Sequence, residues 1–319
     1  MNDRILPDYS EDLGHGVFQI DTGFGRPRFD AAYLLVDAGR AAFIDSGTNF
    51  AVPRLLATLE ALGLAPEAVD YVIPTHVHLD HAGGVGLLMQ ELPAATLICH
   101  PRGLRHMVDP SQLWAGATAV YGPEVMARDY GQLVPVAAAR ARASEDGMLL
   151  KLGTRELSLI DTPGHARHHH CIWDPVSQGW FTGDTFGLSY REFDVDGRPW
   201  ALPTSTPVQF DPEALKASLA RLLEPRPQCM YLTHFGRVRE VPRLAALLVE
   251  LVDRMVEVAR AAQAERHERI KRDLLTVYAD SLRAHGCSMA KAEIARLLEV
   301  DLELNAQGLE VWLEKPPVR

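Results

Sequence analysis

Short apolar runs separated by polar turns fill the first three quarters of the chain and predict β-strands. These runs cover residues 17–21, 31–36, 41–44, 68–74, 96–99, 148–152, 156–160, 171–173, 180–182 and 229–232. Helical spacing instead predicts helices at 52–62 and 84–92, and a further helix begins at Asp211-Pro212, an N-cap followed by proline. The pattern therefore indicates a mixed α/β protein.

Two segments depart from this pattern. Residues 103–142 combine aromatic side chains with scattered proline and glycine, which predicts an insertion of short helices and loops. This insertion either covers a pocket or forms a packing layer without a ligand. From residue 241 onward the spacing is helical only, with a third helix expected from a Ser288 cap to Leu298 and a fourth at 305–313. We therefore expect one domain at 1–240 and a helical domain at 241–319.

Charge and composition limit the classes of partner that the chain is expected to bind. The 319 residues include 32 Lys and Arg against 42 Asp and Glu, a formal net charge of −10, which disfavours nucleic acid as a partner. The four cysteines are widely spaced, and neither a signal peptide nor an apolar run of about 18 residues is visible. We expect a cytoplasmic protein with a small-molecule substrate, no membrane contact and a possible homodimer.

The candidate chemistry centres on Thr75-His76-Val77-His78-Leu79-Asp80-His81, which directly follows a predicted strand. His76 and His78 are two positions apart, so extended backbone directs both side chains to one face. Further ligand-type residues follow other predicted strands, and these are His165, Asp184 and His234. Ligands gathered at strand ends by a rigid scaffold are typical of a metal site.

The residue types predict two metal centres. Three imidazoles would form the first centre, from His76, His78 and His165. The second would take Asp80, His81 and His234, with Asp184 bridging both metals. Imidazole and carboxylate suit Zn²⁺ best, and iron or manganese is an alternative. Paired metals hold a hydroxide near neutral pH, so the site predicts hydrolysis without a Ser or Cys nucleophile.

These motifs resemble the metallo-β-lactamase superfamily. The resemblance covers residues 15–236 and includes Asp45-Ser46-Gly47, the 75–81 stretch, Thr162-Pro163-Gly164-His165, Gly183-Asp184 and Thr233-His234. It implies a four-layer αββα sandwich, and the complete ligand set is most similar to the glyoxalase II-like branch. Phe235-Gly236-Arg237 stands where glyoxalase II has Glu-Tyr-Thr, so a glutathione thioester is disfavoured as substrate.

The expected activity is hydrolysis of an ester-like bond: a carboxylic ester, lactone, thioester or phosphoester. Alternatives are a mononuclear iron enzyme resembling sulfur dioxygenases, and a metal- or oxygen-binding protein without turnover. Asp80 is expected both to bind metal and to orient water or move a proton. Asp45 and His169 are expected to support the ligands, whereas His168 and His170 are expected at the surface or in packing.

The substrate pocket is expected to draw on the loop around Phe24, the 103–142 insertion and the 186–206 loop. Aromatic side chains in these segments offer apolar contact surface. The candidates are Phe24, Trp114, Phe186 and Tyr190.

Overall fold

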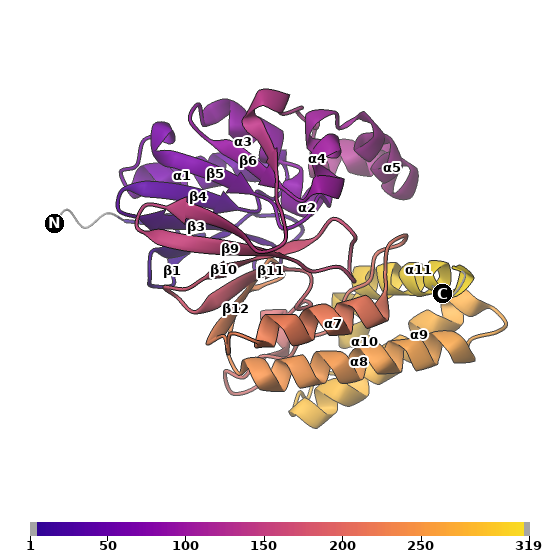
Figure 1. Ribbon diagram of the computed structural model, residues 1–319. Helices are drawn as coiled ribbons and strands as arrows, with labels where there is room; N and C mark the ends of the chain where they lie inside the picture. Colours follow the sequence, from indigo (N-terminus) through magenta and orange to yellow (C-terminus); the bar gives the residue numbers. More distant parts are fainter. Residues whose placement is uncertain (1–4, 316–319) are drawn as a thin grey trace. The chain divides into compact units, whose positions relative to one another are not determined.

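The computed structural model describes residues 5–315 (Figure 1). They form two compact units, and segments of the chain alternate between them. The first unit holds residues up to 161 together with 168–183 and 228–237, and the second holds 162–167, 184–227 and the residues from 238 onward. In this division residues 184–227 group with the C-terminal helices. The predicted domain boundary at 240 stays a prediction.

The first unit contains a seven-stranded mixed sheet in the order β1-β2-β3-β4-β5-β6-β7. Its strands are β1 Ser10–Asp12, β2 Val17–Asp21, β3 Ala31–Asp37, β4 Arg40–Ile44, β5 Val69–Ile73, β6 Thr96–Cys99 and β7 Ala141–Ala143. Neighbours are antiparallel from β1 to β4 and parallel from β4 to β7. The expected hairpin is formed by β3 and β4, with Tyr33 opposite Ile44.

A second mixed sheet has the order β13-β12-β11-β10-β9-β8. Its strands are β8 Met148–Leu152, β9 Arg155–Asp161, β10 His170–Asp174, β11 Gly179–Gly183, β12 Cys229–Leu232 and β13 Gly236–Val238. Inward residues of the two sheets share one buried core, in which Leu35 and Ile44 meet Leu159, Ile172 and Phe181. The sheets therefore form the expected sandwich.

Helices cover the outer face of the first sheet (Figure 1). Leu55 and Leu59 of α1 (Val52–Ala61) and Leu88 of α3 (Val85–Glu91) share a core with Phe43 and Leu97 of the strands. Their helical spacing places these side chains on one face, and burying that face holds the layer together.

The insertion begins after β6 and contains short helices, as expected. It comprises α4 Pro101–Val108, α5 Ser111–Tyr121, α6 Pro123–Val125 and a π-helix at Met126–Tyr130. Leu79, Met126 and Tyr130 form a small buried cluster, against which Phe24 and Trp114 pack. The insertion thus packs onto the residue between His78 and Asp80.

The second unit is mainly helical. It contains α7 Pro212–Leu223, α8 Val241–Ala261, α9 Arg266–His285, α10 Lys291–Leu297 and α11 Glu299–Glu314. Helix α7 packs on α8, and α8, α9 and α11 pack together around Leu248, Met255, Leu274 and Leu309. The buried Asn305 accepts from the Ser205 backbone N–H at 2.7 Å and donates to the Tyr278 hydroxyl at 3.0 Å. This side chain therefore ties α11 to α9 and to the loop before α7.

The fold class predicted from the sequence is confirmed: two mixed sheets with helices and a C-terminal helical region. Two of the predicted helix starts were wrong. The cap of α10 is Ala290 rather than Ser288, and α11 begins at Glu299 rather than Asn305. None of the helices in residues 5–315 combines the length and the apolar character that crossing a bilayer requires.

Candidate metal centre

The predicted ligand stretch follows β5, the fifth strand of the first sheet. His76 is fully buried and His78 is the N-cap of the short helix α2, Leu79–Ala82. The Nε2 atom of His76 lies 2.7 Å from the Nδ1 atom of His78. The extended backbone before α2 therefore brings two imidazole nitrogens together, as their spacing predicted.

Three further ligand-type residues of the first unit converge at α2. The ligand atoms of Asp80, His81 and His234 all lie within 4.8 Å of one another. Oδ2 of Asp80 is 3.7 Å from Nε2 of His81 and 3.3 Å from Nε2 of His234. His81 and His234 are buried, whereas a quarter of the Asp80 side chain is exposed. A carboxylate with two imidazoles is a set of donors that a divalent metal ion accepts.

The remaining nitrogen of each imidazole has a fixed partner. Nδ1 of His81 lies 2.9 Å from Oδ2 of Asp45, and Nδ1 of His234 donates to the Phe29 carbonyl at 2.9 Å. Nδ1 of His76 lies 3.2 Å from the Thr75 hydroxyl. An acceptor on Nδ1 places the proton there and leaves the Nε2 lone pair available to a metal.

Asp45 holds several parts of this site together. It follows β4, is 1% exposed and has a φ of 55°, a left-handed conformation that Asp tolerates better than most residues. Its carboxylate accepts from the Thr75 backbone N–H and from the Thr233 hydroxyl, both at 2.7 Å. The ends of β4, β5 and β12 are thereby tied to His81.

The second unit contributes two of the predicted ligands. Nε2 of His165 lies 3.3 Å from Oδ2 of Asp184, and Nδ1 of His165 donates to the Thr204 carbonyl at 3.1 Å. Gly164, at φ 137°, approaches α7 so closely that a Cβ atom would lie 2.3 Å from the Leu215 Cα atom. Glycine is therefore required immediately before His165.

The histidine run after His165 is buried. His169 stacks on His76, with ring centroids 4.7 Å apart, and the His168 ring lies 5.4 Å from that of His78. His170 contacts the Ser144 hydroxyl at 2.8 Å and the Pro74 carbonyl at 2.9 Å. His168 and His170 are therefore packing residues, and neither is at the surface.

The pKa of the His170 imidazole is strongly lowered. Burial is the main reason that its pKa falls to about 4, so this imidazole is neutral over the physiological range. A neutral His170 donates from one ring nitrogen and accepts at the other. This allows it to join β10 to the end of β5 without a buried charge.

Asp30 is a buried acid that the sequence did not single out. It directly precedes β3 and has no exposed surface, and Oδ1 has no hydrogen-bond partner among the described residues. Burial raises its pKa to about 7, the nearby Asp80 charge adds to the increase, and His234 and His81 oppose it. Asp30 therefore belongs to the electrostatic surroundings of the site.

The predicted pocket residues divide into two groups. Phe24 and Trp114 are partly exposed, whereas Phe186 and Tyr190 are buried and belong to the second unit. The Tyr190 hydroxyl donates to Asp301 at 3.0 Å, which is a packing role within that unit. Phe186 and Tyr190 have almost no exposed surface, and their place in a substrate pocket stays a prediction.

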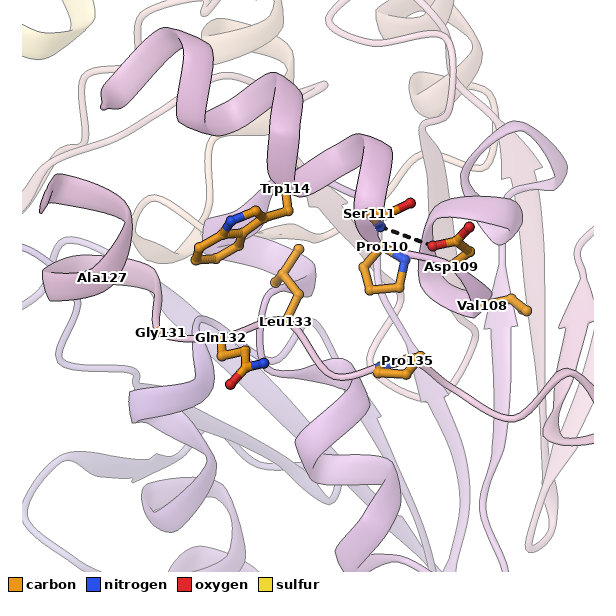
Figure 2. Close-up of a pocket in the computed structure, with 10 residues that line it drawn as sticks. All are labelled: Val108, Asp109, Pro110, Ser111, Trp114, Ala127, Gly131, Gln132, Leu133 and Pro135. Atoms are coloured by element: carbon orange, nitrogen blue, oxygen red, sulfur yellow. Dashed lines mark hydrogen bonds between the residues drawn. The ribbon is translucent and has the colours of Figure 1, made fainter. Parts of the chain in front are cut away.

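A pocket of about 790 Å³ lies in the insertion, between the start of α5 and residues 127–135. Figure 2 shows the Trp114 ring on one side of it and Leu133 and Gln132 facing it. The residues that line it include none of the predicted metal ligands. Trp114 therefore lines this pocket, and its role in a substrate pocket stays a prediction.

The sequence did not reveal the roles of Thr75, Thr233 and the Phe29 carbonyl. Both threonines donate hydrogen bonds to Asp45, and the Phe29 carbonyl accepts one from His234. Thr75 and Thr233 each directly precede a predicted ligand, and that adjacency was the available clue. The Phe29 carbonyl has no side-chain pattern that would reveal it.

The fold and the donor set together define an α/β sandwich with imidazole and carboxylate donors at its strand ends. The chain belongs to the Metallo-beta-lactamase superfamily, because the model of that family matches residues 25–234.

Relatives of known sequence are consistent with this membership. The chain is 27% identical over 221 residues to "Metallo-beta-lactamase fold-containing protein ST1585" of Sulfurisphaera tokodaii, covering 66% of this chain and 75% of the relative. It is 30% identical over 215 residues to the hydroxyacylglutathione hydrolase of Xanthomonas euvesicatoria, covering 63% and 68%. It is 27% identical over 199 residues to the acyl-coenzyme A thioesterase MBLAC2 of Gallus gallus, covering 59% and 68%.

The solved structure of the archaeal protein ST1585 has the same fold. It aligns with a TM-score of 0.64 at 22% identity, covering 93% of this chain and 99% of that one. At this identity the likeness shows the fold alone.

Proposed function

We propose that this chain is a dinuclear metal-dependent hydrolase that acts on an ester-like bond. One observation carries the proposal: Asp80, His81 and His234 converge within 4.8 Å, and both imidazoles are held by acceptors at Nδ1. Structural histidines usually use their nitrogens for packing hydrogen bonds, whereas these keep Nε2 directed toward a shared carboxylate.

Seven residues are proposed to hold the metals. They are His76, His78, Asp80, His81, His165, Asp184 and His234. His165 follows β9 by four residues, and Asp184 directly follows β11. Zn²⁺ suits this set, and iron or manganese fits the same donors. When bound, two such ions would supply a hydroxide nucleophile near neutral pH and polarise the bond to be broken.

The chain's own residues orient the reaction. Asp80 is the most exposed of the acidic candidates, and its two oxygens allow one to bind metal while the other accepts a proton from water. Asp45 and the Phe29 carbonyl keep His81 and His234 in the tautomer with a free Nε2. Their role is to position ligands and not to contact substrate.

The ester-like bond is proposed on two grounds. In the described residues 5–315 no Ser or Cys nucleophile motif accompanies the cluster, so water is the proposed attacking group. Two of the relatives are named as hydrolases of thioesters or glutathione conjugates, and this supports a carbonyl or similar centre as the target. Phe235-Gly236-Arg237 stands where a glutathione-binding Glu-Tyr-Thr is expected, which disfavours glutathione as part of the substrate.

The test combines metal analysis with a substrate panel. Purified protein is loaded with zinc, iron or manganese, the bound metal is counted by mass spectrometry, and carboxylic esters, lactones, thioesters and phosphoesters are assayed. We expect two equivalents of metal and turnover of at least one class. Asp80→Asn and His81→Ala should lower turnover by about 100-fold or more and reduce the bound metal.

An exposed histidine provides the matched control. His15 is on a turn at φ 59°, so His15→Asn should keep both metal and turnover. Circular dichroism and thermal unfolding verify that each variant is folded. One equivalent of iron with oxygen uptake would instead indicate the dioxygenase alternative, and bound metal without turnover on any class would indicate a binding protein.

A further inference from the structure

Four aromatic rings form a continuous row that begins at a proposed metal ligand. The Phe29 ring centroid lies 5.3 Å from that of His234 and 6.1 Å from that of Phe24. Phe24 lies 5.4 Å from Tyr130, which stacks on Tyr121 at 5.7 Å. These separations lie in the range of favourable aromatic contacts. We call Phe24, Phe29, Tyr121 and Tyr130 the aromatic row.

The row is built from two distant parts of the sequence. Phe24 and Phe29 belong to the loop between β2 and β3, whereas Tyr121 and Tyr130 belong to the insertion. Leu79 of α2 packs against the row, because Leu79, Phe24 and Tyr130 share one apolar cluster. The row is therefore attached to the element that carries Asp80 and His81.

The two tyrosine hydroxyls of the row stay protonated near neutral pH. Burial is the main cause that raises the pKa of Tyr121 to about 12, and the negative charge of Asp80 contributes to the increase for both Tyr121 and Tyr130. The two hydroxyls are hydrogen-bonded to each other. The row thus presents apolar ring faces and neutral O–H groups, without a charge of its own.

The outer end of the row reaches an exposed apolar surface. Helix α5 has no charged residue, and none of its eleven residues is fully buried. Val120 is 52% exposed and Tyr121 is 37% exposed. Phe50, which is 57% exposed, lies beside Gly131, where an added Cβ would meet its ring at 3.6 Å. Exposed apolar side chains beside a proposed active site make this surface a candidate binding surface.

We propose that the aromatic row is an acyl subsite that selects substrates with a bulky apolar or aromatic group beside the bond to be hydrolysed. This inference rests on the proposed function. A small molecule fits the row better than a protein partner, because the rings lead from the exposed Tyr121 to Phe29, which lies beside His234. The ester-like end would lie at the inner, polar end, and the apolar group would lie along the rings.

The experiment measures selectivity and binding separately. Hydrolysis of p-nitrophenyl acetate, octanoate and phenylacetate is compared, because the leaving group is constant and only the acyl group varies. Binding of 4-phenylbutyrate and of acetate is measured by calorimetry on the metal-loaded protein. We expect kcat/KM to favour the large acyl groups and 4-phenylbutyrate to bind more tightly than acetate.

Tyr121 is the residue to change, because it is 37% exposed and its replacement should leave the fold intact. Tyr121→Ala should lower the octanoate-to-acetate ratio of kcat/KM by about tenfold, mainly through KM, and weaken 4-phenylbutyrate binding. Tyr121→Phe keeps the ring and should retain the selectivity. Trp312→Ala removes a partly exposed aromatic side chain from α11 in the second unit and should leave the ratio unchanged.

The outcomes separate the two proposals. Hydrolysis with equal preference for all acyl groups, unaffected by Tyr121→Ala, would overturn the subsite and leave the hydrolase intact. Binding of 4-phenylbutyrate that Tyr121→Ala weakens, without hydrolysis of any ester, would support the subsite and count against the hydrolase. Equal binding of 4-phenylbutyrate by both proteins would overturn the subsite whatever the turnover.

Discussion

The carboxylate of Asp45 lies 2.9 Å from Nδ1 of His81, with both side chains almost completely buried. The same carboxylate also accepts from the Thr75 backbone and the Thr233 hydroxyl. One acid therefore sets the tautomer of an imidazole and holds the ends of three strands in place. This relationship makes Asp45 the best residue for testing how the scaffold prepares the ligands.

Asp45→Asn should weaken metal binding without emptying the site. An amide has one acceptor oxygen instead of two. Thr233 and His81 both contact Oδ2 of Asp45, and the Thr75 backbone N–H donates to Oδ1, so one of the two oxygens loses its role as acceptor. Comparable supporting residues lower metal affinity by about 10- to 100-fold when changed. Asparagine tolerates the left-handed backbone at this position. Chelator competition on the purified variant measures the affinity, and an affinity equal to that of the unchanged protein would show that His81 needs no such partner.

Gly183 is predicted to be indispensable beside the histidine stack. It has a φ of 46°, and a Cβ atom there would lie 2.4 Å from the Thr75 hydroxyl and 2.7 Å from Nε2 of His169. Gly183→Ala should therefore destabilise the fold by roughly 2–4 kcal/mol, from backbone strain together with overpacking. Urea unfolding measures this difference.

Gly147 provides the control for that substitution. It has a φ of 79°, and an added Cβ would meet no atom within 4 Å. Gly147→Ala should show the backbone effect alone, about 1 kcal/mol. If the two variants lost the same stability, crowding around His169 and Thr75 would not be the reason that position 183 requires glycine.

Asp30 should give the metal-free protein a distinctive dependence on pH. Its pKa is raised from 3.8 to about 7 in the fold, so the folded state disfavours the charged carboxylate. The unfolded chain releases the proton near pH 4, and the folded chain releases it near pH 7. The contribution of Asp30 to the free energy of unfolding therefore falls as pH rises between these values, and it stays low above them.

Asp30→Asn removes this titration and keeps the side-chain shape. The stability of the variant relative to the unchanged protein should rise between pH 4 and pH 7 by roughly 2–4 kcal/mol. Urea titrations at several pH values, on protein treated with a chelator, measure the difference. If the free energies of unfolding of the two proteins changed equally with pH across this range, Asp30 would have the same pKa in the folded and the unfolded chain.

Regular elements were predictable because local patterns determine them. The predicted runs 17–21, 96–99 and 229–232 coincide with β2, β6 and β12. The Asp211 cap is also as expected, since its side chain accepts from the Ala214 N–H at 3.1 Å. In these segments the spacing of apolar residues and a single capping residue carry enough information.

What depends on distant contacts was not predictable. Short edge strands such as β1 and β7 carry little apolar pattern, and they form because a longer neighbour offers hydrogen bonds. Asp30 shows the same limit: one carboxyl before a strand is common, and only the folded chain brings it near Asp80 and His234. The hydrogen bond of Tyr190 was not predictable either, because its partner, Asp301, is 111 positions away.

The two strands that flank the insertion are paired, with Cys99 opposite Ala143. The insertion therefore leaves and re-enters the sheet at adjacent points, and its replacement would demand no change in the strands. All the proposed metal ligands lie outside it. Exchange of residues 101–140 for another loop would therefore keep every proposed metal ligand in the chain, and it would change the side chains that pack against Leu79.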